Sequence, residues 1–176
     1  MTNLGFSVRA ARTSDVRAIK QLVEPLVQRR ILLGKDLVVF FESVQQFSVA
    51  VDDATGEVIG CGALHVIWED LGEVRTLAAA DSRRGSGVGH SILNRLEDAA
   101  LALGLTRLFC LTFEVEFFAR YGFAPVDERL LVDPEVYSEL LRSPDEGVAE
   151  FLDLSRVKPN TLGNTRMLKQ LAPRAD

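Results

Sequence analysis

The sequence of 176 residues contains few of the cysteines and histidines that form disulfides or bind metal ions in small proteins. Its two cysteines, Cys61 and Cys110, lie in separate apolar runs, which favours reduced, packed thiols over a disulfide. Its two histidines, His65 and His90, are scattered, so no spacing typical of a metal site is present. We therefore expect a fold that needs neither a disulfide nor a metal ion.

A long apolar run and an excess of positive charge are also missing. No stretch approaches the roughly 20 apolar residues that span a bilayer, and Met1 to Arg12 contain no signal-like apolar segment. The formal net charge of -5 disfavours nucleic acid as the main partner, because phosphate contacts need a basic face. These absences predict a cytoplasmic protein that binds neither membrane nor nucleic acid.

What is present is the composition of a globular protein, with 47% hydrophobic and 26% charged residues. The chain has no repeat and no linker, so we expect one domain over residues 1–176. Apolar periodicity distinguishes strands from helices. It predicts strands at 6–10, 46–52, 58–68, 73–80, 107–112 and 122–126, and extended segments at 150–154 and 166–171. It predicts helices at 16–27, 36–44, 88–103, 115–121 and 134–142.

Local chemistry refines this pattern. Pro25 is expected to kink or end the first helix because it lacks an N–H. Three successive strands without a crossover helix favour antiparallel pairing. Alternation along the fourth of these strands places Glu73, Arg75, Leu77 and Ala79 on one face.

The segment Arg84–Gly89 (R-G-S-G-V-G) joins the fourth strand to a helix. Its alternate glycines let successive N–H groups point the same way, and such a nest at a helix N-terminus binds phosphate. Arg83 and Arg84 add positive charge. The segment lacks the Gly-Lys-Ser/Thr of a Walker loop, and the preceding strands lack the crossover helices of a dinucleotide-binding unit. The alternative is a tight turn without a ligand.

A second motif, Phe117–Phe123 (F-F-A-R-Y-G-F), follows a further strand. The order of elements, the segment Arg84–Gly89 and this aromatic motif together resemble the GCN5-related N-acetyltransferase (GNAT) family over residues 6–126. The resemblance implies an α+β fold of three layers (α/β/α), with a mixed, mostly antiparallel central sheet and helices on both faces. It also implies that Arg84–Gly89 holds the pyrophosphate of the cosubstrate acetyl-CoA.

Shorter segments resemble the acetyltransferase domain of bacterial N-acetylglutamate synthases. They are Arg30–Lys35, Gly72–Ala78, Leu108–Thr112 and Arg120–Phe123. The segment Lys158–Leu168 resembles the short form of that family, from which the amino-acid-kinase-like domain of the longer form is absent. The resemblance implies an enzyme that acetylates the α-amine of glutamate or glutamine, the first step toward arginine, and it suggests a homodimer.

The resemblance assigns roles to individual residues. Glu73 matches an acid that removes the amine proton, and Thr112 matches a hydroxyl that protonates the thiolate or orients a water. The strand that ends at Leu77–Ala79 is expected to splay from the one that ends at Thr112, so that pantetheine pairs with the free backbone edge. The residues expected to bind acetyl-CoA are Leu77, Ala78, Ala79, Arg83, Arg84, Gly85, Ser86, Gly87, Val88 and Gly89. Those expected to bind the amino acid are Lys35, Thr76, Thr165 and, as an added candidate, Arg75.

Some positions depart from the family pattern. Many related acetyltransferases place a tyrosine acid where this chain has Phe118. The base expected two positions before Thr165 is replaced by Gly163, for which Lys158 or Arg166 are candidate substitutes. A site with one cation fewer is compatible with glutamine as well as with glutamate.

Alternative interpretations stay open at this point. Glu73 and Arg75 can form a surface salt bridge, Thr112 can be an ordinary strand residue, and a lone Lys35 is usually a solvated charge. For the whole chain, the alternatives are an acetyltransferase for another amine or a protein substrate, and a non-catalytic regulator that binds acetyl-CoA.

Overall fold

Seven strands form one mixed sheet in the computed structural model, which describes residues 5–126, 131–152 and 163–172. The strands are β1 (Phe6–Ala10), β2 (Phe47–Asp52), β3 (Val58–Val66), β4 (Leu71–Ala79), β5 (Arg107–Thr112), β6 (Ala124–Pro125) and β7 (Thr165–Gln170). Their spatial order is β1-β2-β3-β4-β5-β7-β6. The pair β4–β5 is parallel, and the other neighbouring pairs are antiparallel.

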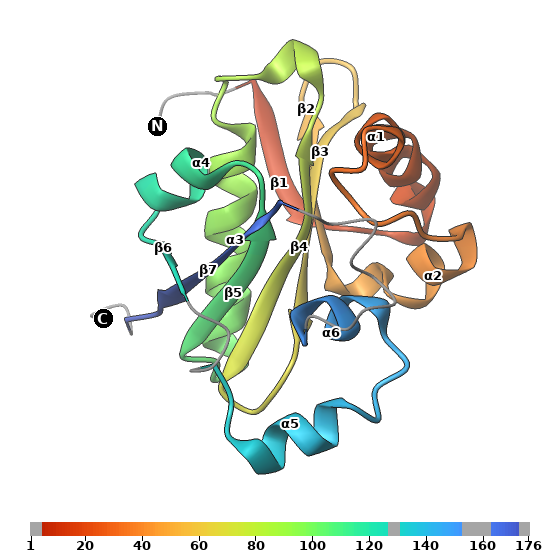
Figure 1. The fold of residues 1–176 in the computed structure, drawn as a ribbon. Coiled ribbons are helices and arrows are strands. Elements are labelled where there is room, and N and C mark those ends of the chain that lie inside the picture. The colour runs from red at the N-terminus through yellow and green to blue at the C-terminus, as the bar shows by residue number, and fades with distance from the viewer. Residues whose placement is uncertain (1–4, 127–130, 153–162, 173–176) are drawn as a thin grey trace.

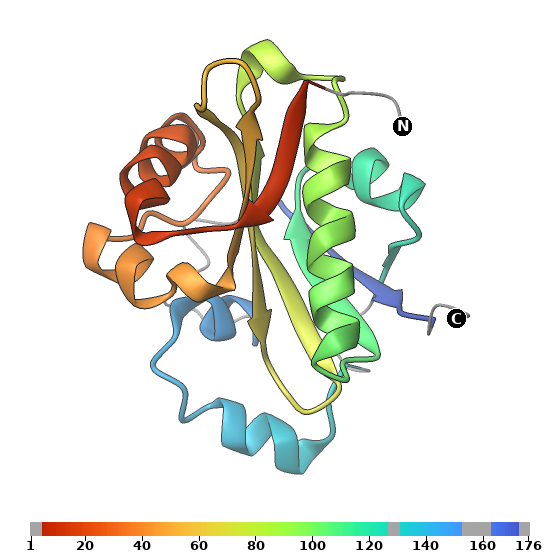
Figure 2. The ribbon, with the colours of Figure 1, turned by 180° about the vertical axis from the view of Figure 1, so that it is seen from behind.

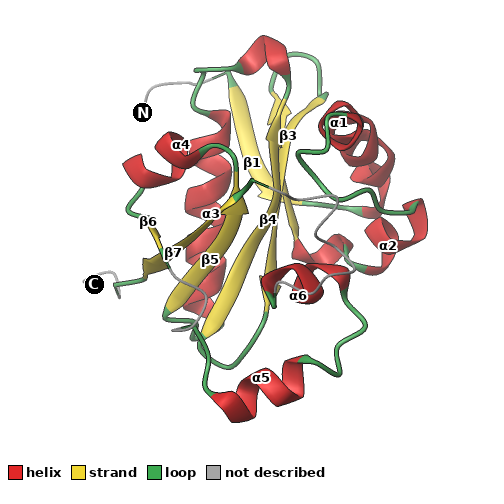
Figure 3. Cartoon of the chain, viewed as in Figure 1, coloured by secondary structure: helices red, strands yellow, loops and turns green. Residues whose placement is uncertain are grey.

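Helices cover both faces of this sheet. They are α1 (Val16–Gln28), α2 (Leu37–Glu42), α3 (Val88–Ala102), α4 (Val115–Arg120), α5 (Pro134–Leu140) and α6 (Glu146–Phe151). Figures 1 and 2 show α3 and α4 on one face and α1, α2 and α6 on the other. This arrangement, drawn by element type in Figure 3, confirms the expected three-layer α+β fold. Within the described ranges, no helix is long and apolar enough to cross a membrane.

Each face of the sheet has its own apolar core. The stripe predicted for α3 is buried against the sheet and consists of Val88, Ile92, Leu93, Leu96 and Ala100. Opposite it, α1 packs on β2 and β3 through a second cluster that includes Val16, Ile19, Val23, Val49 and Cys61. The helix α3 is followed by Gly104, whose φ of +84° supports a left-handed C-terminal turn, as the sequence predicted.

The strands β4 and β5 pair along only part of their length. Their register joins residues 71–73 to residues 107–109, and no pairing follows beyond Glu73. The expected splay is therefore confirmed. Further along β4, Ala63 of β3 faces Arg75 whereas Cys61 faces Ala78, so two residues of β4 oppose Gly62 alone. This extra residue is a β-bulge.

The bulge contains Thr76, whose φ is +54°. A β-branched residue in this left-handed region is an outlier that the surrounding structure must hold in place. Cys61 Sγ lies 3.5 Å from the Thr76 carbonyl oxygen and donates a weak hydrogen bond to it. The neighbouring strand therefore stabilises the bulge from behind.

The bulge also corrects the expected arrangement of side chains along β4. Val74 packs in the core on the α3 side, and so do Leu77 and Ala79. Glu73 and Arg75 lie on the opposite face, where Arg75 contacts α6. The prediction that all four alternating residues share a face was wrong, because the extra residue of the bulge reverses the alternation.

Two further expectations differ from the structure. Pro25 does not end its helix at once, because α1 continues to Gln28, within one turn of the proline. Residues 150–152 are not extended: Glu150 and Phe151 complete α6, and residues 153–154 lie outside the described residues. The helix forms because Asp145 caps it by accepting a hydrogen bond from the Val148 N–H at 2.9 Å.

The contact between α3 and β3 generates a stability prediction. A Cβ on Gly60 would lie 2.5 Å from Val88 Cγ1, closer than packed atoms allow. We expect Gly60→Ala to lower the free energy of unfolding by about 1–3 kcal/mol through overpacking. In the Val88→Ala background, which lacks that methyl group, the same change should cost less. Urea unfolding of the four proteins measures this coupling, and equal stability of wild type and Gly60→Ala would contradict it.

Candidate active site

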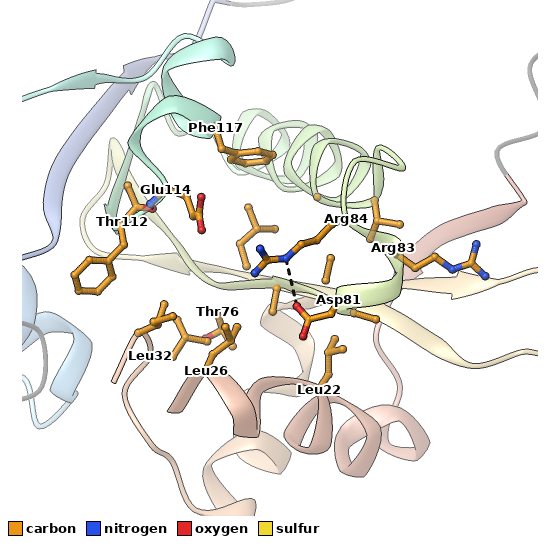
Figure 4. A pocket seen from close by; sticks show the side chains of 18 of the residues that line it. Leu22, Leu26, Leu32, Thr76, Asp81, Arg83, Arg84, Thr112, Glu114 and Phe117 are labelled. Atoms are coloured by element: carbon orange, nitrogen blue, oxygen red, sulfur yellow. Dashed lines mark hydrogen bonds and ion pairs between the residues drawn. The ribbon is translucent and has the colours of Figure 1, made fainter. Parts of the chain in front are cut away.

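A cavity of about 760 Å³ lies where β4 and β5 diverge. The helix α1 and the loop after it form one wall, with Leu22, Leu26 and Leu32, and α4 supplies Phe117 on the other side (Figure 4). The glycine-rich segment and Thr112 at the end of β5 complete the lining. The cavity thus combines apolar walls with backbone groups at the end of a helix, which suits a long ligand with an anionic part.

The glycine-rich segment presents unpaired backbone donors to this cavity. Gly85 and Gly87 have φ values of +77° and +87°, so the chain needs glycine at both positions. Gly87 is the N-cap of α3, and no side chain caps this helix end. The first N–H groups of α3, from Val88 onward, therefore lack acceptors within the helix. A Cβ on Gly89 would approach Phe117 to 3.4 Å, so this glycine allows close packing of α4.

The two arginines of the segment point to different places. Arg84 extends toward the middle of the cavity and lies 3.3 Å from Asp81, whereas Arg83 points away from it (Figure 4). Arg83 forms an ion pair with Asp52, whose carboxylate also accepts hydrogen bonds from the turn after β2. Of the two cations, Arg84 is thus better placed to meet an anion in the cavity.

The free edge of β4 forms one side of the cavity. Thr76, Leu77, Ala78 and Ala79 all line it, beyond the point where β5 stops pairing. The structure therefore brings the four expected β4 residues to one place. An unpaired strand edge of this kind binds an extended ligand through main-chain hydrogen bonds.

Glu73 is buried next to Arg75 and forms no surface salt bridge. Its side chain is 4% exposed, and its Oε2 accepts a hydrogen bond from Arg75 Nε at 2.6 Å. Burial raises the pKa of Glu73, and the nearby Arg75 charge opposes that shift. A carboxylate with a raised pKa is a stronger base once ionised.

Asp145, at the start of α6, binds the other end of the same guanidinium. Its oxygens lie 2.8 Å from Arg75 Nη2 and 3.2 Å from Nη1. Partial burial acts to raise the pKa of Asp145, but the Arg75 charge and hydrogen bonds outweigh it and lower the pKa to about 2. Sequence reasoning missed Asp145, although an acid just before the segment E-G-V-A (146–149) is a helix-cap signal.

Two hydroxyl residues meet at the ends of β5 and β7. Thr112 and Thr165 are direct partners in the antiparallel register. Thr112 is 8% exposed, and its Oγ1 accepts a hydrogen bond from the Glu114 N–H at 2.9 Å. Because that bond uses a lone pair of the oxygen, the hydroxyl proton of Thr112 is available for donation.

Lys35 lies in the loop between α1 and α2, close enough to sense the charges of Glu73, Arg75, Asp145 and Glu150. Burial lowers the pKa of Lys35, and the positive charge of Arg75 lowers it further. Within residues 5–126, 131–152 and 163–172, no carboxylate forms an ion pair with its Nζ. A desolvated ammonium group without a counter-ion favours binding of an anion.

The aromatic motif lies on α4 and after it. Phe118, at the position of the tyrosine acid in many related enzymes, is 6% exposed and packs against Phe123 with ring centroids 5.2 Å apart. Tyr121 stacks on His90 at 4.2 Å. Both of these rings line the cavity next to the first turn of α3. The motif thus fixes α4 beside the glycine-rich segment.

The fold and the cavity are those of an acetyltransferase. The acetyltransferase (GNAT) family model matches residues 22–123, and the chain belongs to this family. An amino-acid acetyltransferase from Mycobacterium tuberculosis is 58% identical over 162 residues, which are 92% of each chain. An amino-acid acetyltransferase from Pseudomonas putida is 36% identical over 120 residues, which are 67% of this chain and 27% of that one.

Solved structures agree with this assignment. A Mycobacterium tuberculosis protein in complex with CoA and a second ligand is 56% identical and has a TM-score of 0.90, covering 94% of this chain and 99% of that one. N-acetylglutamate synthase from Neisseria gonorrhoeae, complexed with coenzyme A and N-acetyl-glutamate, is 26% identical with a TM-score of 0.77. That match covers 96% of this chain and 35% of the synthase. The chain is thus an acetyltransferase that uses acetyl-CoA as the acetyl donor, as the sequence predicted.

The geometry of the glycine-rich segment generates a binding prediction. We expect Gly87→Val to weaken acetyl-CoA binding by at least about tenfold, because a side chain would stand before the N–H groups of α3 and the residue must keep a positive φ. Isothermal titration with acetyl-CoA measures the effect.

Gly104→Val is the matched control for this variant. Gly104 has nearly the same φ, +84°, and a Cβ at either glycine meets no atom within 4 Å. Both variants therefore carry the same backbone strain, but Gly104 lies at the far end of α3 from the cavity. Equal acetyl-CoA affinity of the two variants would contradict a phosphate-binding role for the segment.

Proposed function

We propose that the enzyme acetylates the α-amine of glutamate or glutamine. The observation that carries this proposal is the half-buried Lys35, which senses the charge of Glu73 but forms no ion pair with a carboxylate in the described part of the chain. An enzyme that selects an α-amine must recognise the carboxylate next to it, and a charge-assisted contact is about twice as strong as a neutral one. In this proposal Lys35 supplies that contact, and Thr76 and Thr165 supply further polar contacts to the amino acid.

The reaction joins the amine nitrogen to the thioester carbonyl carbon and breaks the carbon–sulfur bond. Glu73 takes the amine proton, directly or through a water, and later releases it to solvent. The Thr112 hydroxyl donates a hydrogen bond to the departing thiolate or orients the water that protonates it, so Thr112 itself ends the reaction protonated. The backbone N–H of Leu77, on the free edge of β4, stabilises the negative charge that develops on the carbonyl oxygen. In support of these roles, Leu77 and Thr112 line the cavity, and Glu73 lies on β4 four residues before Leu77.

The surroundings of Arg75 favour Lys35 over Arg75 as the main carboxylate contact. The Arg75 guanidinium already faces the carboxylates of Glu73 and Asp145. An anionic substrate would have to compete with both of these acids for it. We therefore assign Arg75 chiefly to Glu73 and retain it as a candidate second contact.

The names of the relatives support the amino-acid substrate and extend the proposal. The Mycobacterium tuberculosis and Pseudomonas putida relatives are amino-acid acetyltransferases, and the Neisseria gonorrhoeae synthase binds N-acetyl-glutamate. By analogy we place this enzyme at the first step toward arginine, as a single-domain cytoplasmic protein that forms a homodimer. A second copy seen by analytical ultracentrifugation would support the last point.

The role of Lys35 generates a kinetic prediction. We expect Lys35→Ala to raise the KM for the amino acid strongly, at least about tenfold, because a charge-assisted contact in a partly desolvated site is lost. The KM for acetyl-CoA should change little, since Lys35 does not line the acetyl-CoA cavity. Steady-state thiol release with glutamate, glutamine and putrescine measures both constants.

Arg17→Ala is the control, because Arg17 is an exposed cation on α1. It should behave as wild type in both constants. If Lys35→Ala also behaves as wild type, or if putrescine is acetylated as readily as glutamate, the amino-acid proposal fails and a general amine acetyltransferase replaces it.

The burial of Glu73 generates a prediction for the pH profile. Glu73 must be ionised to accept a proton, and burial raises its pKa above the ordinary value. Activity should thus be present above that raised pKa and should fall as the pH drops through it. Glu73→Gln should lower kcat about 10²- to 10⁴-fold and remove this acidic limb from the plot of kcat/KM against pH. Glu69→Gln changes an exposed carboxylate and should preserve the limb; a limb retained in Glu73→Gln would exclude Glu73 as the base.

A further inference from the structure

We infer that the first turn of α6 positions Glu73 for the reaction, because Asp145 and Gly147 hold the Arg75 guanidinium against the Glu73 carboxylate. We call Asp145 and Gly147 the α6 clamp. Both residues lie outside the range 22–123 that the family model matches. The inference rests on the proposed function in one respect, the role of Glu73 as the base.

The clamp joins segments that are 70 residues apart in the sequence. Asp145 contacts Arg75 through both carboxylate oxygens, and Arg75 Nε donates to Glu73 Oε2 at 2.6 Å. The side chains of Glu73 and Arg75 are 4% and 8% exposed, and that of Asp145 is 34% exposed. The guanidinium is thus held between a fully buried acid and a partly buried one.

The backbone of α6 leaves room for the guanidinium only because residue 147 is a glycine. A Cβ at this position would lie 2.4 Å from both Cζ and Nη2 of Arg75. Gly147 itself is buried and its φ lies outside the left-handed region, so backbone conformation does not demand a glycine there. The close approach of Arg75 is the physical reason for this residue.

The same helix turn fixes Asp145. One carboxylate oxygen accepts a hydrogen bond from the Val148 N–H at 2.9 Å, and the Asp145 N–H donates to Ser143 Oγ at 3.2 Å. The carboxylate therefore has a set orientation before it meets Arg75. A rigid second carboxylate restricts how Arg75 can be placed against Glu73.

Stability alone does not account for this arrangement. Burying three charged groups costs desolvation free energy, and apolar residues of similar size often stabilise a core as well or better. The groups linked to Glu73 by charge or by strand pairing come from several elements. Arg75 on β4, Asp145 on α6 and Lys35 in the loop after α1 influence its charge. The charge of Glu73 in turn raises the pKa of Cys110 on β5, and His65 on β3 is the register partner of Glu73. Of these, Arg75 is the group hydrogen-bonded to the Glu73 carboxylate.

The decisive experiment is a double-mutant cycle between Gly147→Ala and Arg75→Ala. The new methyl group in Gly147→Ala displaces the guanidinium, and the pKa of Glu73 should then rise because a nearby positive charge moves away. The acidic limb of kcat/KM should move to higher pH, and kcat should fall by about 10²-fold through misplacement of the base. In the Arg75→Ala background, which has no side-chain atom beyond Cβ to meet the new methyl group, Gly147→Ala should have almost no further effect.

Carboxyl-carbon NMR of 13C-glutamate-labelled enzyme, with the Glu73 signal assigned by Glu73→Gln, follows the titration without relying on turnover. An unchanged Glu73 titration in folded Gly147→Ala overturns the clamp. A shifted titration with an unshifted rate profile leaves the clamp in place but overturns Glu73 as the base, so the two failures are distinguishable.

Asp145→Ser provides a second route if Gly147→Ala fails to fold. Serine keeps a good helix cap but removes the second carboxylate from Arg75. We expect kcat/KM to fall at least about tenfold, with a melting temperature like that of Asp133→Ser, which changes the exposed N-cap acid of α5. Full activity of Asp145→Ser overturns the role of Asp145, whereas loss of activity that conservative Asp145→Glu partly restores supports it.

Discussion

The separation of β4 from β5 after three paired residues is the constraint on which the site depends. Parallel strands normally satisfy each other's backbone groups along their whole length. Here the two strands diverge, and the cavity lies between β4 and β5. The free edge of β4, the glycine-rich segment and the end of β5 become adjacent for this reason. The bulge at Thr76 changes which side chains of β4 point to each face of the sheet.

The bulge has an unfavourable backbone conformation that contacts with the neighbouring strand must stabilise. Thr76 adopts a φ of +54°, which is unfavourable for a β-branched residue by about 1–3 kcal/mol. Gly62 on β3 leaves space opposite the bulge, since a Cβ there would lie 2.8 Å from Ile92 and 3.1 Å from Leu77. Cys61, which is next to Gly62 on β3, donates a weak hydrogen bond to the Thr76 carbonyl oxygen. Thus one of the two cysteines that looked like a packing residue also supports the geometry of the site.

The cations near the site differ in whether a carboxylate compensates their charge. Arg83 is tied to Asp52, and Arg75 faces Glu73 and Asp145. Lys35 is partly desolvated without such a counter-ion in the described part of the chain. Simple counting of cations along the sequence could not separate these cases, because whether a charge is compensated depends on residues far away in the chain.

The sequence by itself determined the local structure: the stripe of α3, the strand at 107–112, the turn at Gly104 and the glycine-rich turn before α3. These follow from periodicity, glycine conformation and helix-end chemistry, which act over a few residues. Only the tertiary structure decided the faces of β4, the helical state of residues 150–151 and the pairing of Asp145 with Arg75. Alternation cannot reveal a bulge that the neighbouring strand holds in place, and a six-residue helix is marginal without the packing that buries it. The protonation of Glu73 depends on both sequence and fold. The sequence supplies the carboxyl group, and only the fold places the charges of Arg75, Asp145 and Lys35 near it.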